Sequence, residues 1–316
     1  MPVQFSQNQM EKISNKHFPY CGRIKIQSIT TGKFNSSFYI STDKDEYVLR
    51  IAPSDDEYFI FYERNMMAQE PELHKILRNR TSVPVAEIYV YDTDREIIPN
   101  DYLIMERMPG TPASDASFLS RSLWNDVLTQ LGDFLRQVHA ITAEQYGYLG
   151  AHKPMKPQDT WEQAFAVMWS KMIRQLIDIE AYSESEGEYM LDLFENRCCC
   201  FQREVSASLL HMDVWAQNIL IDSHGNVTGL LDWDRALWGD PEIEFAVLDY
   251  CGISQPAFWR GYGRKRDESP EAKIRFIFYY LYEVQKYIII RSQRNGTWER
   301  AMQYKTETMR IARQLE

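Results

Sequence analysis

Short stretches of alternating apolar and polar residues dominate the first third of the chain. Between residues 23 and 51 the apolar positions recur with a period of two, in three runs separated by the polar segments 31–33 and 42–45. A period of two is typical of half-buried β-strands, because successive side chains point to opposite sides of a strand. The pattern predicts a three-stranded antiparallel meander, then a helical stretch to about Arg80, then strands near 85–91 and 102–106.

Beyond these strands the apolar period changes to 3.6. Amphipathic stripes of helical spacing cover 123–138, 161–179, 190–201 and 274–290. Pro109 and Gly110 interrupt the chain between the two kinds of pattern. The sequence therefore predicts an α+β fold of two lobes, with an antiparallel sheet in residues 1–108 and mostly helices in residues 109–316.

One segment of the second lobe departs from the helical period. Residues 218–232 contain two short β-like runs around the turn sequence Ser-His-Gly-Asn at 223–226. This predicts a β-hairpin inserted among the helices, with Asn218 and Asp232 side by side at its open end.

Composition and charge narrow the classes of function. The 316 residues are 44% hydrophobic and 13% aromatic, and 35 Lys+Arg against 45 Asp+Glu give a formal net charge of -10. This composition is typical of a folded protein, and the acidic balance argues against binding to nucleic acid or to an anionic membrane surface. The polar start of the chain and the run Cys198–Cys200, which matches neither a zinc site nor an easy disulfide, predict a cytoplasmic protein with reduced thiols.

The candidate chemistry lies at the hairpin. The motif H-x-D-x4-N spans His211 to Asn218, and Asp232 follows the second predicted strand. Asp213, five residues before Asn218, can fold back over the open end of the hairpin, so that two carboxylates and an amide oxygen converge. These are the hard oxygen ligands that Mg²⁺ prefers. Phosphoryl transfer uses such a set, because it depends mainly on positioning and on neutralising phosphate charge.

These motifs resemble the aminoglycoside phosphotransferase-like family of small-molecule kinases, which share the protein-kinase fold. The resemblance spans roughly residues 24–250 and is strongest at 211–222 and 229–250, where the family shows H-x-D-x4-N, then a D-W-D/E element, then G-D-P. It implies that Asp213 is the catalytic base, that Asn218 and Asp232 bind Mg²⁺, and that His211 braces the loop. It also implies ATP as the phosphate donor, with GTP not excluded.

The first lobe matches the family less strongly. Residues 30–37, including Gly32, Asn35 and Ser36, resemble the loop that covers the nucleotide phosphates, although one glycine alone is equally typical of an ordinary hairpin turn. Arg50 stands where the family usually has a phosphate-pairing lysine, so its planar fork implies a different pairing geometry. The resemblance suggests Glu70 as the partner of Arg50, with Glu63 as the fallback.

The resemblance extends to the base and acceptor sites. Residues 102–110 resemble the hinge strand, in which backbone groups of Glu106 and Met108 would bind the nucleotide base. In the helical lobe, acidic residues of aminoglycoside kinases bind the amines of a polycationic sugar. This makes Asp240, Glu242 and Glu244 candidate acceptor ligands, although the two glutamates equally suit the start of a helix.

Three hypotheses for function follow from this reading. The first is an ATP-dependent O-phosphotransferase acting on a hydroxyl of an aminoglycoside-type or macrolide antibiotic. The second is a metabolic kinase of the same fold for choline, a fructosamine, homoserine or a sugar. The third is a nucleotide-binding pseudokinase, which Arg50 alone supports. We expect a small-molecule acceptor, and no nucleic acid, membrane or obligatory protein partner.

Overall fold

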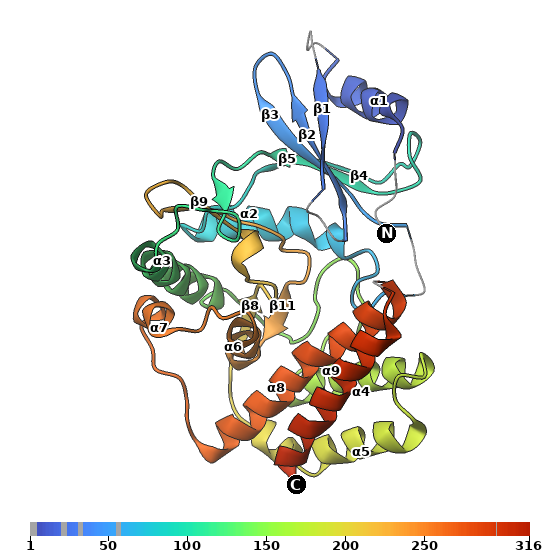
Figure 1. Ribbon diagram of the computed structural model, residues 1–316, viewed down its shortest axis with the longest axis vertical. Coiled ribbons are helices and arrows are strands. Elements are labelled where there is room, and N and C mark those ends of the chain that lie inside the picture. Colours follow the sequence, from blue (N-terminus) through green and yellow to red (C-terminus); the bar gives the residue numbers. More distant parts are fainter. Residues whose placement is uncertain (1–4, 20–23, 31–33, 55–57, 295) are drawn as a thin grey trace.

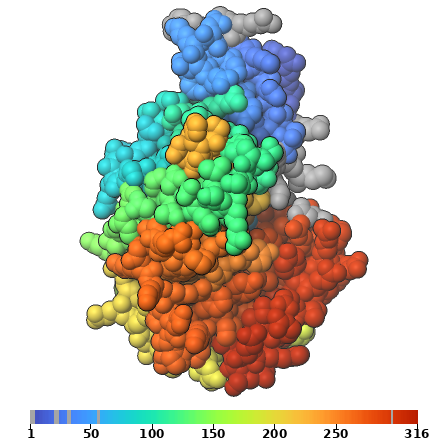
Figure 2. Space-filling view, turned by 60° about the vertical axis from the view of Figure 1, so that its left-hand side comes forward, coloured from blue at the N-terminus to red at the C-terminus, as the bar shows by residue number. Residues whose placement is uncertain are grey.

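The computed structural model describes residues 5–19, 24–30, 34–54, 58–294 and 296–316. A β-sheet forms one end of the molecule and helices form the other, as the predicted α+β architecture requires (Figure 1). In the space-filling view the first strands make a narrow end above a broader body built from the later helices (Figure 2).

The N-terminal sheet has five antiparallel strands in the order β1-β2-β3-β5-β4. It contains the predicted meander and both later strands, with the bounds β1 (Lys25–Ile29), β2 (Ser36–Ser41), β3 (Glu46–Ile51), β4 (Ile88–Asp92) and β5 (Tyr102–Glu106). Alternation along β3 directs Leu49 and Ile51 toward helix α1 (Gln7–His17) on one face. The same alternation directs Arg50 to the opposite face, which helix α2 (Glu70–Arg80) covers.

Helix α2 begins later than the sequence pattern predicts. Pro71 lies in its first turn, where proline is tolerated, and a short 3₁₀ turn (Met66–Gln69) precedes it. The stretch before that turn is irregular, and Asn65 has a φ of 55°. Ile60 and Tyr62 of this stretch are buried in the core of the helical part, so tertiary packing determines its conformation.

The remainder of the described chain is mostly helical. The predicted stripes at 123–138, 161–179 and 274–290 are helices α3, α4 and α8. The stripe at 190–201 ends early, because a 3₁₀ turn (Cys198–Phe201) follows α5. The helices are α3 (Arg121–His139), α4 (Trp161–Asp178), α5 (Glu184–Glu195), α6 (Pro241–Tyr250), α7 (Pro256–Tyr262), α8 (Pro270–Ile289) and α9 (Trp298–Ala312), and a π-turn (Ile290–Arg294) follows α8. In the described ranges, none of them is both long and apolar enough to cross a bilayer.

Two small sheets carry the chemistry-bearing loops. The predicted hairpin is present as β9 (Ile219–Ile221) and β10 (Val227–Leu230), and the connector strand β6 (Thr111–Pro112) pairs with β9. The second sheet, β11-β8-β7, consists of β7 (Thr142–Ala143), β8 (Ala207–Leu210) and β11 (Leu237–Gly239). The loop from β8 to β9 therefore begins and ends on sheets, and this fixes both of its ends.

Candidate active site

His211 fixes the start of the loop that carries Asp213. The imidazole is fully buried and packs against the ring of Trp233 at a centroid distance of 4.3 Å. Its Nδ1 accepts a hydrogen bond from the Asp213 backbone N–H at 3.2 Å, and its Nε2 lies 2.9 Å from the carbonyl oxygen of Leu231. Because Nδ1 accepts, Nε2 carries the proton and donates it. His211 thus ties the loop to the hairpin, in the bracing position that the resemblance implies.

Both carboxylate oxygens of Asp213 have partners. Oδ1 lies 3.0 Å from the guanidinium of Arg235, and Oδ2 accepts from the side-chain amide of Asn218 at 3.2 Å. The Asn218 amide nitrogen also donates to the Asp213 carbonyl oxygen at 2.9 Å, which leaves its amide oxygen as a potential metal ligand. The structure therefore brings Asp213 and Asn218 together, as the motif spacing predicts.

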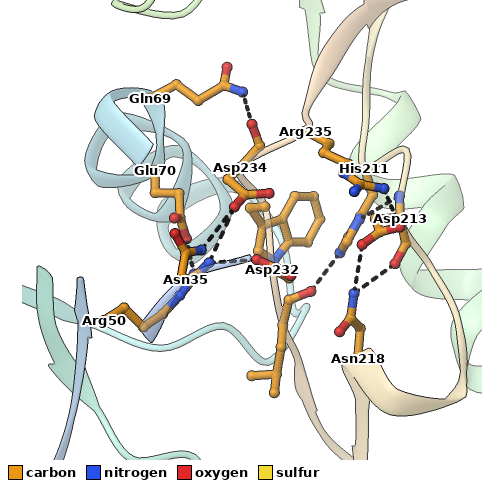
Figure 3. Close-up of polar contacts among 12 residues, drawn as sticks. Asn35, Arg50, Gln69, Glu70, His211, Asp213, Asn218, Asp232, Asp234 and Arg235 are labelled. Atoms are coloured by element: carbon orange, nitrogen blue, oxygen red, sulfur yellow. Dashed lines mark hydrogen bonds and ion pairs between the residues drawn. The ribbon is translucent and has the colours of Figure 1, made fainter. Parts of the chain in front are cut away.

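Asp232 closes the other side of this group (Figure 3). The Leu231 N–H donates to the Asn218 carbonyl oxygen at 2.8 Å, so Asn218 and Asp232 meet at the open end of the hairpin. Asp232 has a φ of 70°, and Met212 in the facing loop has a φ of 64°. Left-handed backbone is uncommon for residues other than glycine, and it is less unfavourable for aspartate than for methionine.

Arg50 reaches the same place from the N-terminal sheet. Its guanidinium lies 2.6 Å from Glu70, 2.6 Å from Asp232 and 3.3 Å from Asp234 (Figure 3). The expected pairing of Arg50 with Glu70 is present. The fallback partner, Glu63, lies elsewhere and pairs with Arg294.

This cluster holds three carboxylates around one guanidinium. Burial raises the pKa of Glu70 to about 7, although Arg50 opposes the shift. Burial, together with the charges of Asp232 and Glu70, raises the pKa of Asp234 well above its ordinary value. Burial also acts to raise the pKa of Asp232, but Arg50 and Arg235 outweigh it, and the net shift is downward. The raised pKa values of Glu70 and Asp234 mean that three ionised carboxylates around one guanidinium are unfavourable here, and a further cation would favour their ionised forms.

The donor set fits Mg²⁺. Asn218 and Asp232 offer oxygen ligands, and the buried Glu70 Oε1 has no hydrogen-bond partner among the described residues. Within the described ranges, no group of three or more His, Cys, Asp or Glu side chains could hold a metal ion by itself. Mg²⁺ is commonly bound by one or two carboxylates, with waters and substrate phosphates completing its coordination, so this smaller set is sufficient.

Sequence reasoning left two contributors to this cluster out of the site. Asp234 accepts from the Asn35 side chain at 3.3 Å, and its carbonyl oxygen accepts from Gln69 at 2.5 Å. The D-W-D spacing at 232–234 was a usable signal for Asp234. Gln69 offered none, because its role depends on how α2 packs against the hairpin.

The other predicted nucleotide-binding residues differ in whether the structure describes them and in what they contact. Gly32 lies outside the described residues, whereas Asn35 is buried and Ser36 begins β2. The Glu106 N–H donates to the Glu87 carbonyl oxygen at 2.8 Å, so this N–H is already engaged within the protein. Met108 packs on an apolar cluster beneath the sheet that includes Met67, Ala86, Leu103 and Met105.

The proposed acceptor ligands have structural partners instead. Glu244 is fully buried and accepts from the backbone N–H groups of His211 and Met212 at 3.0 and 2.7 Å. Its other close partner is His139, at 2.7 Å. Burial opposes ionisation of Glu244, but the contact with His139 outweighs it and lowers the pKa of the carboxyl. Glu244 therefore holds the loop and cannot touch an acceptor.

The other two acids are neutralised by arginines from distant segments. Asp240 is 1% exposed, caps α6 by accepting from the Glu242 N–H, and lies 2.5 Å from Arg203. Glu242 receives two hydrogen bonds from Arg275, at 2.7 and 3.0 Å. Binding of an acceptor's amines by these acids stays a prediction, and it would require them to exchange these partners. Their charges are already paired within the protein.

Comparison of the sequence with known proteins finds a family and several relatives. The sequence profile described as "Phosphotransferase enzyme family" matches residues 25–276. The "Probable ketoamine kinase" of Vibrio cholerae is 24% identical over 76% of this chain and 77% of its own length. The viomycin phosphotransferase of Streptomyces vinaceus is 25% identical over 54% of this chain and 55% of its own length.

A solved structure shows the same fold. A thermostable variant of aminoglycoside phosphotransferase APH(4)-Ia, in a ternary complex with AMP-PNP and hygromycin B, superposes with a TM-score of 0.68. The match covers 96% of this chain and 98% of that structure at 18% identity.

Proposed function

Because the chain belongs to this phosphotransferase family and acts on small molecules, we propose that it transfers the γ-phosphate of ATP to a hydroxyl group. One observation carries the proposal most directly: Asp213, Asn218 and Asp232 lie together with the Arg50–Glu70 ion pair. Three segments far apart in the sequence supply these groups, and phosphoryl transfer requires all of them.

The residues divide the work as follows. Asp213 accepts a hydrogen bond from the acceptor hydroxyl and directs its oxygen at the γ-phosphate in line with the leaving group. Arg50 provides a fixed cation for the phosphates, and Glu70 keeps it oriented. His211 and Glu244 hold the loop, so that Asp213 does not have to be ordered during each turnover. Asn218 and Asp232 would hold Mg²⁺, which would neutralise charge on the phosphates.

The pseudokinase hypothesis loses its support. It rested on Arg50 in place of lysine, yet Arg50 makes the Glu70 ion pair expected of the lysine at this position in the family.

For the acceptor, we propose a hydroxyl of an amine-bearing sugar derivative, with a ketoamine as the first candidate. The acids that suggested a polycationic aminoglycoside are paired with Arg203, Arg275 and His139, which removes the structural argument for a strongly cationic acceptor. The ketoamine kinase relative also covers more of the chain than the viomycin phosphotransferase does. Aminoglycosides and macrolides remain the competing acceptors.

A transfer assay with γ-labelled nucleotide tests the proposal. The panel holds fructosyl amines, aminoglycosides, macrolides, choline, homoserine and free sugars, each with ATP and with GTP, in the presence and absence of Mg²⁺. Labelled product with a fructosyl amine and ATP is the expected result, and Asp232→Asn should abolish the Mg²⁺-dependent part of nucleotide binding in calorimetry. No transfer to any member of the panel would contradict the proposed reaction, and transfer only to an antibiotic would overturn the choice of acceptor.

A further inference from the structure

We infer that Arg235 and Glu63 are positioning residues, which hold the carboxylate of Asp213 for phosphoryl transfer. This inference rests on the proposed function. Arg235 Nη1 lies 3.0 Å from Asp213 Oδ1, and Nη2 lies 3.9 Å from Glu63 Oε1. The guanidinium thus lies between a carboxylate of the active-site loop and one from the stretch that precedes α2.

The contact belongs to a line of alternating charges. Asp213, Arg235, Glu63 and Arg294 follow one another, and their side chains are 17%, 16%, 0% and 18% exposed. Glu63 is the fixed point of this line, because its Oε2 also accepts from the Ile60 N–H at 2.7 Å. The line connects the active-site loop to the turn after α8, from which Arg294 also faces the rings of Phe34 and Phe59.

Burial explains why Arg235 needs Glu63. Burial penalises the charged guanidinium, but Asp213 and Glu63 are among the groups that outweigh this effect, so the pKa of Arg235 lies well above its ordinary value. A cation this deeply placed is stable only when it is paired. With only Asp213 as a neighbour, it would follow any movement of that carboxylate. Glu63 adds a second opposite charge from a different segment, at a distance of 3.9 Å that is longer than a hydrogen bond.

The result is a carboxylate restrained at both oxygens. Asn218 holds Oδ2 and Arg235 holds Oδ1, so the plane of the Asp213 carboxylate is fixed relative to the hairpin. In a loose transition state the main task of the carboxylate is to orient the hydroxyl. Holding the Asp213 carboxylate in place therefore costs little rate, and it fixes the orientation of this carboxylate toward the hydroxyl. Losing the contact with Arg235 should affect turnover much more than nucleotide binding, because Arg50 and not Arg235 faces the phosphate side.

The test measures kcat and nucleotide KM with the acceptor identified by the transfer assay. Arg235→Met keeps side-chain length and removes the charge. Misplacement by about 1 Å can cost on the order of 100-fold, so we expect kcat to fall about 10- to 100-fold and the nucleotide KM to change by less than about 3-fold. Arg235→Lys should recover much of the loss. Glu63→Gln, which keeps the shape of the side chain, should lower kcat by about 3- to 10-fold.

Arg266→Met is the matched control. Arg266 likewise forms a partly exposed pair with an aspartate, Asp249 at 2.5 Å, but it lies in the segment before α8 and does not contact Asp213. The Arg266→Met variant should have the kcat of the wild type. Thermal unfolding of all variants shows whether a loss of turnover reflects a loss of folded protein.

The double variant with Asp213→Ala distinguishes positioning from general structural support. If Arg235 acts through Asp213, adding Arg235→Met to Asp213→Ala should change the residual rate by less than about 2-fold. The inference would be overturned if Arg235→Met lowered the rate by the same factor in the wild type and in Asp213→Ala. A folded Arg235→Met variant with wild-type kcat would also overturn it. If the wild type transfers no phosphate to any acceptor, the proposed function itself fails, which is a separate outcome.

Discussion

Arg50 bridges two parts of the molecule through its three carboxylate neighbours. Glu70 comes from α2, whereas Asp232 and Asp234 follow the hairpin, so one guanidinium connects the sheet to the active-site loop. A lysine ammonium is a compact charge, whereas the planar fork of arginine places Nη1 toward Glu70 and Nη2 toward Asp232 and Asp234. The arginine carries the same charge as the usual residue but spreads its donors over a wider group of acids.

Replacing Arg50 by lysine should leave partial activity. We expect Arg50→Lys to raise the nucleotide KM by about 10-fold, because one or two carboxylates lose their hydrogen bonds while a phosphate cation remains. Steady-state kinetics with varied ATP measures this, and Arg310→Lys on the exposed face of α9 is the control. Complete inactivity of a folded Arg50→Lys variant would show that the fork geometry itself is required.

For individual side chains, the sequence was sufficient to place residues next to one another where they lie close together in the chain. Asp213, Asn218 and Asp232 could be placed from one motif and one hairpin. Asp240, Glu242 and Glu244 could not, because their partners Arg203, Arg275 and His139 come from other segments. The acidic pattern is the same whether its charges face a ligand or buried arginines.

Helix α6 supports the active-site loop through Glu244. Two backbone N–H groups and His139 donate to this one buried carboxylate. Glu244→Ala would leave these donors without partners, and the free energy of unfolding should fall by about 3 kcal/mol. Urea unfolding measures the change. Glu307→Ala, which removes an exposed pair with Arg310, is the control and should cost less than about 0.5 kcal/mol.

The connector between the sheet and the helices depends on Gly110. Its φ is 112°, and an added Cβ would lie 2.3 Å from the Thr228 hydroxyl oxygen and 2.9 Å from the Ile221 carbonyl oxygen. Gly110→Ala should therefore destabilise the protein by about 2 kcal/mol or more. Gly252→Ala is a matched control, because Gly252 also has a positive φ but has no atom within 4 Å of an added Cβ. Equal losses in the two variants would mean that backbone strain alone, and not the contact with β9 and β10, makes Gly110 necessary.

Element prediction succeeded where the period was long and regular. The period-two runs and the stripes of α3, α4 and α8 gave elements close to those observed. The stretch before α2 was misassigned to a helix, because its apolar residues Ile60 and Tyr62 pack on the helical part rather than along a helix face of their own. Such tertiary packing leaves no periodic signal in the sequence.

The charge of the whole molecule is distributed differently from what its sequence suggests. Residues 211–250 hold eight acids and one arginine, so along the sequence the surplus negative charge is concentrated in this segment. In the fold, arginines from outside this segment reach most of these acids: Arg50, Arg203, Arg266 and Arg275. Around Arg50 the acids Glu70, Asp232 and Asp234 outnumber the single guanidinium, and this is where Mg²⁺ would act.

The buried His74 should by itself make the folded protein less stable in mild acid. Burial lowers the pKa of His74 from its ordinary 6.5 to about 4. The unfolded chain therefore takes up a proton below about pH 6.5 that the folded protein does not bind until about pH 4, so stability is lost as the pH falls through this window. At pH 5 the loss from His74 should approach about 2 kcal/mol relative to pH 7.

The variant His74→Asn isolates this contribution. Asparagine keeps a donor for the Ala86 carbonyl oxygen, which His74 Nδ1 contacts at 2.8 Å, but it does not titrate. Urea unfolding between pH 5 and 7 should show that this variant loses less stability on acidification than the wild type does. His224→Asn, at an exposed turn position, should lose as much stability as the wild type. Equal losses for all three proteins would contradict the assignment.

The central claim is that Asp213 orients the acceptor hydroxyl while other residues bind the nucleotide. The most direct measurement compares phosphate transfer and nucleotide affinity in Asp213→Ala and the wild type, with the same acceptor and Mg²⁺. A positioned acid–base group typically contributes on the order of 10² to 10⁴ in rate, so kcat should fall at least about 100-fold while the nucleotide dissociation constant changes by less than about 3-fold. Wild-type turnover in a folded Asp213→Ala variant would contradict the account.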